Sequence, residues 1–393
     1  MKNRYRKSKG LRYDHEDGRT SPSLDRRTGN GGRTCGRVDQ PVGPPSRTRS
    51  RDLPAREHRG LFPVVLLSTA VTHEAALPAQ WNPKASAVVT WIERSIGPAA
   101  HVARIEVLSV SATAKHLVSV VLGDGSTRRL VLRRYHDAER LAHDPWYVPE
   151  HEALALKLLT NSAVPAPRLH AADLEAAVCD VPALLESWVP GSQAWQPDDL
   201  DSYLARAAEV LVAIHAVRVP SDVELPRYAP HNERERAVSP PFSTRPGLWE
   251  RVADVLDAPR PAPRETFIHR DYHPGNVLWD GTQVTGVVDW ATAAWGPPGI
   301  DLARMRLNLA SHLGRGIADR FVVAYVTAGG DPSTRNPVWD LLDAADLLPD
   351  PALPSEPPGN DLAWWTRFED YVESVLTERR GQKTPGPKSR GRR

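Results

Sequence analysis

The sequence predicts an α+β protein of two lobes, a small N-terminal lobe with an antiparallel sheet and a larger, mainly helical C-terminal lobe. Strand-like runs on either side of Asp124-Gly125 indicate an early β-hairpin. Beyond Gly191 the apolar residues recur at helical spacing, starting with the segment 200–214. Pro190-Gly191 lies where this character changes, so we expect the two lobes to join there.

In the first lobe, alternating apolar residues predict strands, and spacings of three and four predict helices. Gly97-Pro98 ends the first helix, and Pro165 and Pro167 follow the second. The predicted elements are a helix over 87–96, strands over 104–110, 117–122 and 129–135, a helix over 152–159 and a strand over 183–189.

In the second lobe, short apolar runs separated by polar turns interrupt the helical pattern, and Asp280-Gly281 marks a further hairpin. The predicted elements are a helix over 200–214, brief strands at 267–268, 277–279 and 284–288, and helices over 300–313, 317–328 and 362–376.

Composition divides the chain into four segments. Residues 1–78 are rich in Arg, Gly, Pro and Ser without any period, so we expect a disordered basic tail. Residues 79–190 form the predicted N-terminal lobe, and 191–380 the predicted helical C-terminal lobe. Residues 381–393 are expected to be a second disordered basic tail.

The net charge of +2 conceals an uneven distribution. Residues 1–60 hold 16 basic and 7 acidic residues, and 379–393 hold 7 basic and no acidic ones, which leaves 61–378 at −14. An acidic body favours a cationic substrate, because carboxylates around a cleft concentrate amines. The basic tails have almost no interleaved aromatic residues, so no specific nucleic acid partner is expected.

Cysteine content and hydropathy bear on localisation. Cys35 and Cys179 are too few for a disulfide framework or a cysteine zinc site. The apolar run 62–70 is about half as long as a membrane-spanning helix. We therefore expect a cytoplasmic protein with no membrane partner, and the sequence leaves the oligomeric state open.

The most specific feature is the segment His269-Arg270-Asp271-Tyr272-His273-Pro274-Gly275-Asn276, which has the spacing of a kinase catalytic loop. Asp289 follows after a predicted hairpin, where a second metal-binding side chain is expected. Phosphoryl transfer requires Mg²⁺ on hard oxygen ligands, for which Asn276 and Asp289 are the candidates. Asp271 can accept the proton of a substrate hydroxyl and is the predicted catalytic base.

Together with Gly296-Pro297-Pro298 and Asp301-Leu302-Ala303, this segment resembles the aminoglycoside phosphotransferase family of small-molecule kinases. The resemblance extends over about residues 85–310. It implies a protein-kinase-like fold, ATP or GTP as co-substrate, and Mg²⁺. A protein kinase would carry Asp-Phe-Gly where this chain has Asp289-Trp290-Ala291.

The resemblance also implies a basic residue at the end of the third strand that holds the α and β phosphates of the nucleotide. Arg133 takes this place, with Glu152 on the following helix as its carboxylate partner. Arg134 is the alternative if the strand register differs by one residue.

A phosphate-covering loop is implied at 109–116, which contains no glycine, so Ser111, Thr113 and backbone N–H groups are the candidate contacts. Adenine is expected to bind the backbone of the connector 185–188, which includes Glu186 and Trp188. Trp188 either packs on the base or fills the core.

Three residues, His269, His273 and Asp301, are expected to support the site, and His215 is expected to have a structural role only. His269 should brace the catalytic loop through hydrogen bonds to the backbone. His273 should stabilise the turn or approach phosphate or metal. Asp301 should act as a helix cap or a loop anchor, and His215 as a satisfied residue at a helix end.

The predicted function is transfer of the γ-phosphoryl group of ATP or GTP to a hydroxyl of a small, cationic molecule. The resemblance implies aminoglycosides, macrolides, amino alcohols and sugars as acceptor classes. The alternative is a catalytically weak nucleotide-binding relative that acts as a scaffold, although Asp271, Asn276 and Asp289 together argue against it. The acceptor pocket is expected from 192–250 and 335–378, with Trp195, Trp249, Trp364, Trp365, Glu369 and Asp370 as candidates.

Overall fold

The computed structural model describes residues 85–111, 113–230, 237–258, 264–349 and 361–383, all within one compact unit of the chain. The predicted tail 1–78 and residues 384–393 lie outside the described residues. Helix α9 (Leu362–Lys383) continues beyond the predicted boundary at 380, so the second tail cannot begin at 381.

Five antiparallel strands form one sheet in the order β1-β2-β3-β5-β4. Gly125 adopts φ 81° in the turn between β2 and β3, which is the predicted hairpin. The α+β prediction is therefore confirmed. The strands are β1 (His101–Val110), β2 (Ala114–Val121), β3 (Thr127–Arg134), β4 (Leu169–Asp173) and β5 (Ala183–Ser187).

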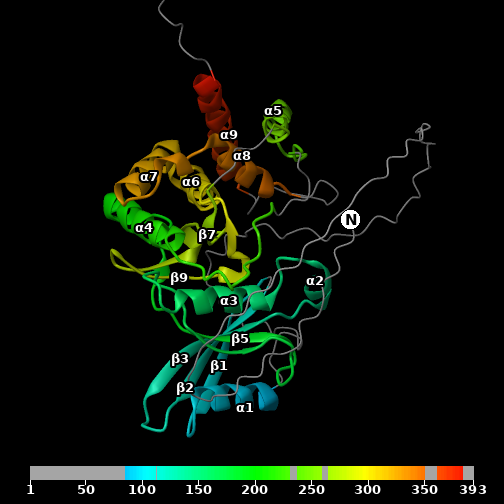
Figure 1. Cartoon of the computed structure of the whole chain (residues 1–393), viewed down its shortest axis with the longest axis vertical. Helices are drawn as coiled ribbons and strands as arrows, with labels where there is room; N and C mark the ends of the chain where they lie inside the picture. The colour runs from blue at the N-terminus through cyan, green and yellow to red at the C-terminus, as the bar shows by residue number, and fades with distance from the viewer. Residues whose placement is uncertain (1–84, 112, 231–236, 259–263, 350–360, 384–393) are drawn as a thin grey trace, which may run out of the picture. The chain divides into compact units, whose positions relative to one another are not determined.

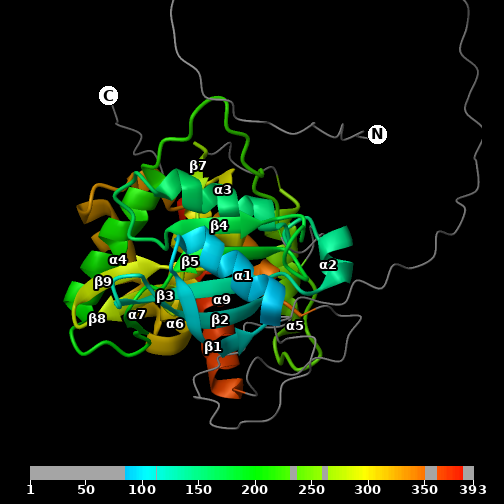
Figure 2. The ribbon, with the colours of Figure 1, turned by 90° about the horizontal axis from the view of Figure 1, so that it is seen from below.

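Two helices cover opposite faces of this sheet, α1 (Ala85–Ile96) and α3 (Pro149–Leu159) (Figure 1). From α1, Val88 packs with Leu130 and other buried residues of the sheet. From α3, Ala153 packs with Leu184. Figure 2 shows α1 lying across the strands on one face of the sheet. The short helix α2 (Ala138–His143) lies to the side of α1 in this view.

The connection between β1 and β2 is much shorter than the loop predicted over 109–116. Val110 already pairs with Ala114, so only residues 111–113 lie between the two strands. Register shifts in β1, one of them between Val107 and Ser109, let the ladder continue to the turn. The predicted phosphate-covering loop is therefore a tight turn, and Lys115 belongs to β2.

Six helices make up most of the second lobe. The central one is α6, which contacts α7, α8 and α9 and contributes Met305 to the core, against Phe321 and Phe368. Among the described residues, no helix is long and apolar enough to cross a bilayer. The helices are α4 (Leu200–His215), α5 (Pro246–Leu256), α6 (Gly299–Leu313), α7 (Arg315–Thr327), α8 (Pro337–Asp346) and α9.

Helices α5 and α8 were not predicted from the sequence. Each begins with a proline at its first position, Pro246 or Pro337. Proline is well tolerated there, because the first helical N–H has no partner within the helix.

Small strands position the catalytic loop. It runs from β7 (Thr266–Ile268) to β8 (Val277–Asp280), and β8 pairs with β9 (Gln283–Val287) as a hairpin. β6 (Ser192–Gln193) borders β8, and β10 (Ala294–Gly296) pairs with β7. The predicted motif 269–276 therefore begins directly after β7 and ends directly before β8, and each of these strands pairs with a further strand.

Gly191 marks the junction of the lobes and cannot easily be replaced. Its φ is 118°, and a Cβ there would lie 2.7 Å from the carbonyl oxygen of Trp279. The chain can therefore pass this close to β8 only with glycine at this position.

Candidate active site

Asp301 of α6 anchors the catalytic loop through two hydrogen bonds to its backbone. Its Oδ2 accepts a hydrogen bond from the His269 N–H (2.9 Å) and its Oδ1 one from the Arg270 N–H (2.6 Å). His215 Nε2 lies 3.2 Å from Oδ2, while its Nδ1 lies 2.9 Å from the Tyr325 hydroxyl. Of the two expected roles, Asp301 is thus a loop anchor, since no side chain caps the start of α6.

Arg270 stands in a strained conformation that this anchor maintains. Its φ is 72°, a left-handed value that costs about 1–3 kcal/mol for such a residue. Its guanidinium lies 3.6 Å over the ring of Trp146 and donates to the carbonyl of Ala229. The left-handed backbone conformation of Arg270 sets the direction in which the next residue, Asp271, projects.

His269 braces the loop against the strand that leads to Asp289. Its Nε2 lies 3.0 Å from the carbonyl oxygen of Val288, and its Nδ1 accepts from the Asp271 N–H at 3.2 Å. Burial lowers the pKa of His269, which favours the neutral ring. One ring nitrogen donates and the other accepts, as a neutral imidazole requires.

Asp271 is an ionised carboxylate surrounded by donors. Asn276 Nδ2 donates to its Oδ2 at 3.1 Å, His273 Nε2 lies 3.5 Å from the same oxygen, and Arg304 Nε lies 3.3 Å from Oδ1. Burial alone would raise the pKa of Asp271, but His273 and Arg304 hold it well below its usual range. The carboxylate is therefore ready to accept a hydrogen bond at neutral pH.

Asn276 and Asp289 lie at the same end of the β8–β9 hairpin, where the Val288 N–H donates to the carbonyl of Asn276 at 2.9 Å. Asn276 directs its Nδ2 at Asp271, which leaves its Oδ1 for a cation. Asp289 adopts the left-handed conformation at φ 69°, ψ 61°, which Asp tolerates better than most residues. One carboxylate and one amide oxygen suit Mg²⁺, which takes its other ligands from phosphates and water.

A buried cluster of charges surrounds Arg133. Its Nε lies 2.9 Å from Glu152 Oε2 and 3.7 Å from Glu186 Oε1, and its Nη2 donates to Asp289 Oδ1 at 2.8 Å. Lys115 Nζ donates to the other oxygen of Asp289 at 3.0 Å. The structure thus brings together Arg133, Glu152, Glu186 and Asp289 from the predicted set.

The other basic residue of β3 faces elsewhere. Arg134 Nη2 lies 2.6 Å from Asp180 Oδ2, and the Arg134 side chain is buried. The register therefore directs Arg133, and not Arg134, toward the catalytic loop.

The protonation state of Glu186 affects the net charge of this cluster. Burial, with the charge of Glu152 close by, raises the pKa of Glu186 to about 8. By contrast, Lys115 and Arg133 outweigh burial at Asp289 and hold its pKa well below the usual range. Glu186 is therefore mostly protonated near pH 7, and burial raises the pKa of Glu152 as well, against the opposing effect of Arg133.

We expect the substitution Glu186→Gln to stabilise the protein increasingly, relative to the wild type, as pH rises from about 5 to about 8. Glu186 ionises near 4.5 when unfolded and at about 8 when folded, so the folded state binds the extra proton between these values. Raising the pH through this range therefore removes stability from the wild type only, on the order of 1 kcal/mol per pH unit.

Thermal melts at about pH 5, 6.5, 8 and 9 measure this difference. The exposed Glu150 on α3 supplies the matched control, since Glu150→Gln should follow the wild type at every pH. Melting temperatures of Glu186→Gln that run parallel to those of the wild type would contradict a raised pKa at Glu186.

Three charged residues near the site were not predicted: Lys115, Arg304 and Asp343. Arg304 lies one turn after Asp301 on α6, and its Nε is 3.3 Å from both Asp271 Oδ1 and Asp343 Oδ1. Asp343 is buried on α8, and burial raises its pKa to about 7. The i, i+3 spacing of Asp301 and Arg304 was a signal in the sequence, because it places both residues on one helix face.

The predicted nucleotide contacts outside the charged cluster have separate positions. Ser111 and Thr113 lie in the β1–β2 turn, where the Ser111 N–H donates to the Thr113 carbonyl at 3.1 Å. In the connector, the N–H groups of Ser187 and Trp188 pair with the carbonyls of Arg168 and Arg129. Trp188 is half-buried, with the Arg129 guanidinium 5.5 Å over its ring, so it does not fill the core.

Most residues expected in the acceptor pocket belong to the helical core instead. Trp249 and Trp365 are buried against each other, and Trp249 Nε1 donates to Glu369 Oε1 at 2.9 Å. The same oxygen, Glu369 Oε1, also accepts a hydrogen bond from the Ser243 hydroxyl at 2.5 Å, and the Glu369 side chain is buried. Trp249, Trp365 and Glu369 therefore belong to the helical core, because aromatic residues at helical spacing usually pack between helices.

The remaining candidates lie in different surroundings. Trp195 is half-buried, 6.1 Å from the His273 ring and 4.6 Å from the His312 ring, and so lies beside the catalytic loop. Trp364 stacks on Phe368 in the core. Asp370 is exposed and pairs with Arg245.

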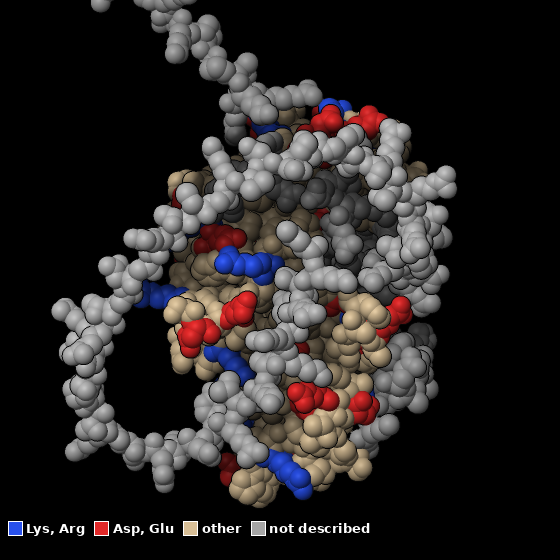
Figure 3. All heavy atoms as spheres, turned by 45° about the vertical axis from the view of Figure 1, so that its right-hand side comes forward, with Lys and Arg blue, Asp and Glu red and all other residues tan. Residues whose placement is uncertain are grey.

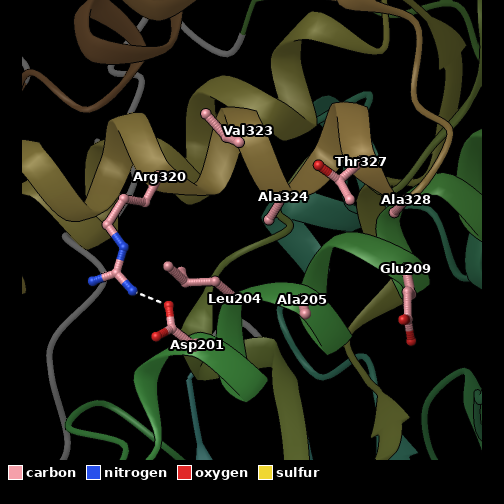
Figure 4. Close-up of a pocket in the computed structure, with 9 residues that line it drawn as sticks. All are labelled: Asp201, Leu204, Ala205, Glu209, Arg320, Val323, Ala324, Thr327 and Ala328. Carbon is pink, nitrogen blue, oxygen red and sulfur yellow. Dashed lines mark hydrogen bonds and ion pairs between the residues drawn. The ribbon is translucent and has the colours of Figure 1, made fainter.

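A groove between α4 and α7 lies away from the catalytic loop (Figure 4). Arg320 bridges it to Asp201, and the exposed Val323 lies on its rim. Elsewhere, the face drawn in Figure 3 carries interspersed acidic and basic side chains among the described residues. Neither feature adds a group to the site around Asp271.

Comparison with known proteins identifies the family of this chain. The chain matches the model of a phosphotransferase enzyme family (APH) over residues 111–344. The N-acetylmuramate/N-acetylglucosamine kinase of Pseudomonas putida is 28% identical over 161 residues, which cover 37% of this chain and 45% of that protein. The chain thus spans less than half the length of this curated relative.

Solved structures agree on the fold. A thermostable mutant of aminoglycoside phosphotransferase APH(4)-Ia in its apo form is 17% identical, with a TM-score of 0.50 over 75% of this chain and 100% of that one. A ternary complex of such a mutant with AMP-PNP and hygromycin B is 16% identical, with a TM-score of 0.49 over 76% of this chain and 100% of that one. At such identities the likeness concerns the fold alone.

Proposed function

The chain belongs to the phosphotransferase enzyme family, and from this premise we propose that it transfers the γ-phosphoryl group of ATP or GTP to a hydroxyl group of a small molecule. The observation that carries the proposal is the arrangement of Asp271, Asn276 and Asp289, which one loop and one hairpin bring together above the anchor Asp301. These are the parts that phosphoryl transfer requires: a carboxylate for the acceptor hydroxyl and oxygen ligands for a cation.

In the proposed mechanism, Asp271 accepts a hydrogen bond from the acceptor hydroxyl, orients its oxygen toward the γ-phosphorus and takes its proton as transfer proceeds. Arg304 and His273 keep Asp271 ionised, and Asn276 fixes its rotation. Asp289 and Asn276 Oδ1 would hold Mg²⁺, which when bound neutralises charge on the nucleotide phosphates.

The nucleotide is proposed to lie with its phosphates beside Asp289, where Arg133 and Lys115 supply positive charge. Ser111 and Thr113 are the proposed phosphate contacts from the β1–β2 turn. The base is proposed to lie along the connector that contains Glu186 and Trp188. Its donors would come from groups other than the Ser187 and Trp188 N–H, which already pair within the sheet.

The acceptor is proposed to be an aminoglycoside, a macrolide, an amino alcohol or a sugar. The match to a sugar kinase supports adding N-acetylglucosamine and N-acetylmuramate to the panel. The acidic body supports the cationic amino compounds.

A screen with labelled ATP and labelled GTP against this panel tests the proposal. Transfer of label to any member, abolished by removing Mg²⁺, is the expected result. Mg-dependent nucleotide binding with no transfer to any member would favour the alternative of a binding or scaffold protein. Absence of both binding and transfer would overturn the kinase proposal.

A further inference from the structure

Two cations from adjacent strands share the carboxylate of Asp289. The ladder between β2 and β3 places Lys115 directly opposite Arg133, so both side chains leave the same face of the sheet. Lys115 Nζ donates to Asp289 Oδ2 at 3.0 Å, and Arg133 Nη2 donates to Oδ1 at 2.8 Å. A metal on Asp289 would bring the nucleotide phosphates to both cations.

The two cations differ in what else holds them. The Arg133 side chain is 4% exposed, and its Nε faces Glu152 at 2.9 Å and Glu186 at 3.7 Å. The Glu152 carboxylate also accepts from the Tyr135 hydroxyl at 2.6 Å, which ties it to the end of the sheet. Arg133 therefore keeps a counter-charge behind it whatever happens at Asp289.

Lys115 has no such second anchor. Its side chain is 23% exposed, and within the described part of the chain its salt bridge is to Asp289. An ammonium on a flexible stem with three rotatable donors can turn from a carboxylate to a phosphate without breaking other contacts. The Arg133 guanidinium has its Nε on Glu152 and its Nη2 on Asp289, so it can move toward a phosphate only as far as the contact with Glu152 allows.

We infer that Lys115 of β2 is the cation that contacts the polyphosphate of the bound nucleotide, and that Arg133 of β3 is a positioning residue. Arg133 ties the sheet to α3 through Glu152 and orients Asp289. The inference rests on the proposed nucleotide-binding function and changes which strand supplies the phosphate contact.

The test compares binding of adenosine, ADP and ATP in the presence of Mg²⁺ by calorimetry, with the guanosine series alongside. It uses the full chain and the variants Lys115→Met, Lys115→Arg, Arg133→Lys and Lys157→Met. Lys157 is exposed on α3 and is the matched control for loss of a lysine.

Lys115→Met should weaken ADP and ATP binding by roughly 10- to 100-fold, the usual effect of losing a hydrogen bond to a charged group, and leave adenosine binding within about twofold. Lys115→Arg should restore most of the ADP affinity, and Lys157→Met should match the wild type. Arg133→Lys should lower the melting temperature, because one ammonium group cannot replace the several N–H donors of the guanidinium. The ratio of ATP to adenosine affinity should stay at the wild-type value in this variant.

Equal ATP affinity in Lys115→Met and the wild type would overturn the inference while leaving the proposed function intact. A changed ATP-to-adenosine ratio in Arg133→Lys alone would do the same. A wild-type chain that binds neither nucleotide series would instead remove the proposed function, and the inference with it.

Discussion

Replacing Asp271 by Asn is expected to lower kcat by roughly 10²- to 10⁴-fold, the usual contribution of a positioned base. The amide cannot take the proton of the acceptor hydroxyl. It can still accept from Asn276 with its oxygen, as the carboxylate does at 3.1 Å, so the loop should keep its shape. Nucleotide affinity should stay within about twofold of the wild type, because Asp271 lies on the acceptor side.

Single-turnover kinetics with the acceptor found in the screen, together with calorimetry for the nucleotide, separate the two effects. Asp280→Asn is a matched control, since Asp280 is exposed at the far end of the same hairpin. The low pKa of Asp271 also predicts that its ionisation causes no loss of rate between about pH 6 and 8. An unchanged kcat in Asp271→Asn would remove this residue from the mechanism.

Replacing Asp289 by Asn is expected to weaken Mg-dependent nucleotide binding by roughly 10²- to 10³-fold, as loss of one partner in a desolvated charge interaction does. Asn tolerates the left-handed backbone at φ 69°, so the change removes the charge without adding strain. Lys115 and Arg133 lose their shared counter-ion, which makes the site more positive and would by itself favour phosphate.

The comparison with and without Mg²⁺ isolates the metal ligand. In EDTA, Asp289→Asn should bind ATP at least as well as the wild type, because only the cations then act. In Mg²⁺, the wild type should gain affinity and the variant should not. Equal gains in both proteins would show that Asp289 is not a metal ligand.

The catalytic loop was predictable because its chemistry is contiguous in sequence. Asp271 and Asn276 lie within one segment, and a single hairpin brings Asp289 back to it. The part of the sheet made by β1, β2 and β3 was predictable for the same reason, since strands joined by short turns pair locally, whereas β4 was not predicted.

Lys115 and Arg304 were not predictable in this way. Lys115 lies opposite Arg133 because β2 continues past the predicted strand 117–122, back to Ala114, in the unbroken register of the β2–β3 hairpin, and no residue type announces this extension. The contact of Arg304 with Asp343 joins α6 to α8. Helix α8, which begins at Pro337, was not predicted from the sequence. Both contacts arise from packing between segments distant in sequence, which periodicity does not specify.

Because Asp301 anchors the catalytic loop to α6, we expect activity to be lost on heating at the temperature at which the helical core melts. Its two oxygens hold consecutive N–H groups of the catalytic loop, while its helix is packed against α7, α8 and α9. The loop therefore cannot loosen by itself without taking two backbone N–H donors away from a buried carboxylate, which is costly. Catalysis should persist on warming until the helical lobe unfolds and then disappear with it, leaving little temperature range for a folded but inactive enzyme.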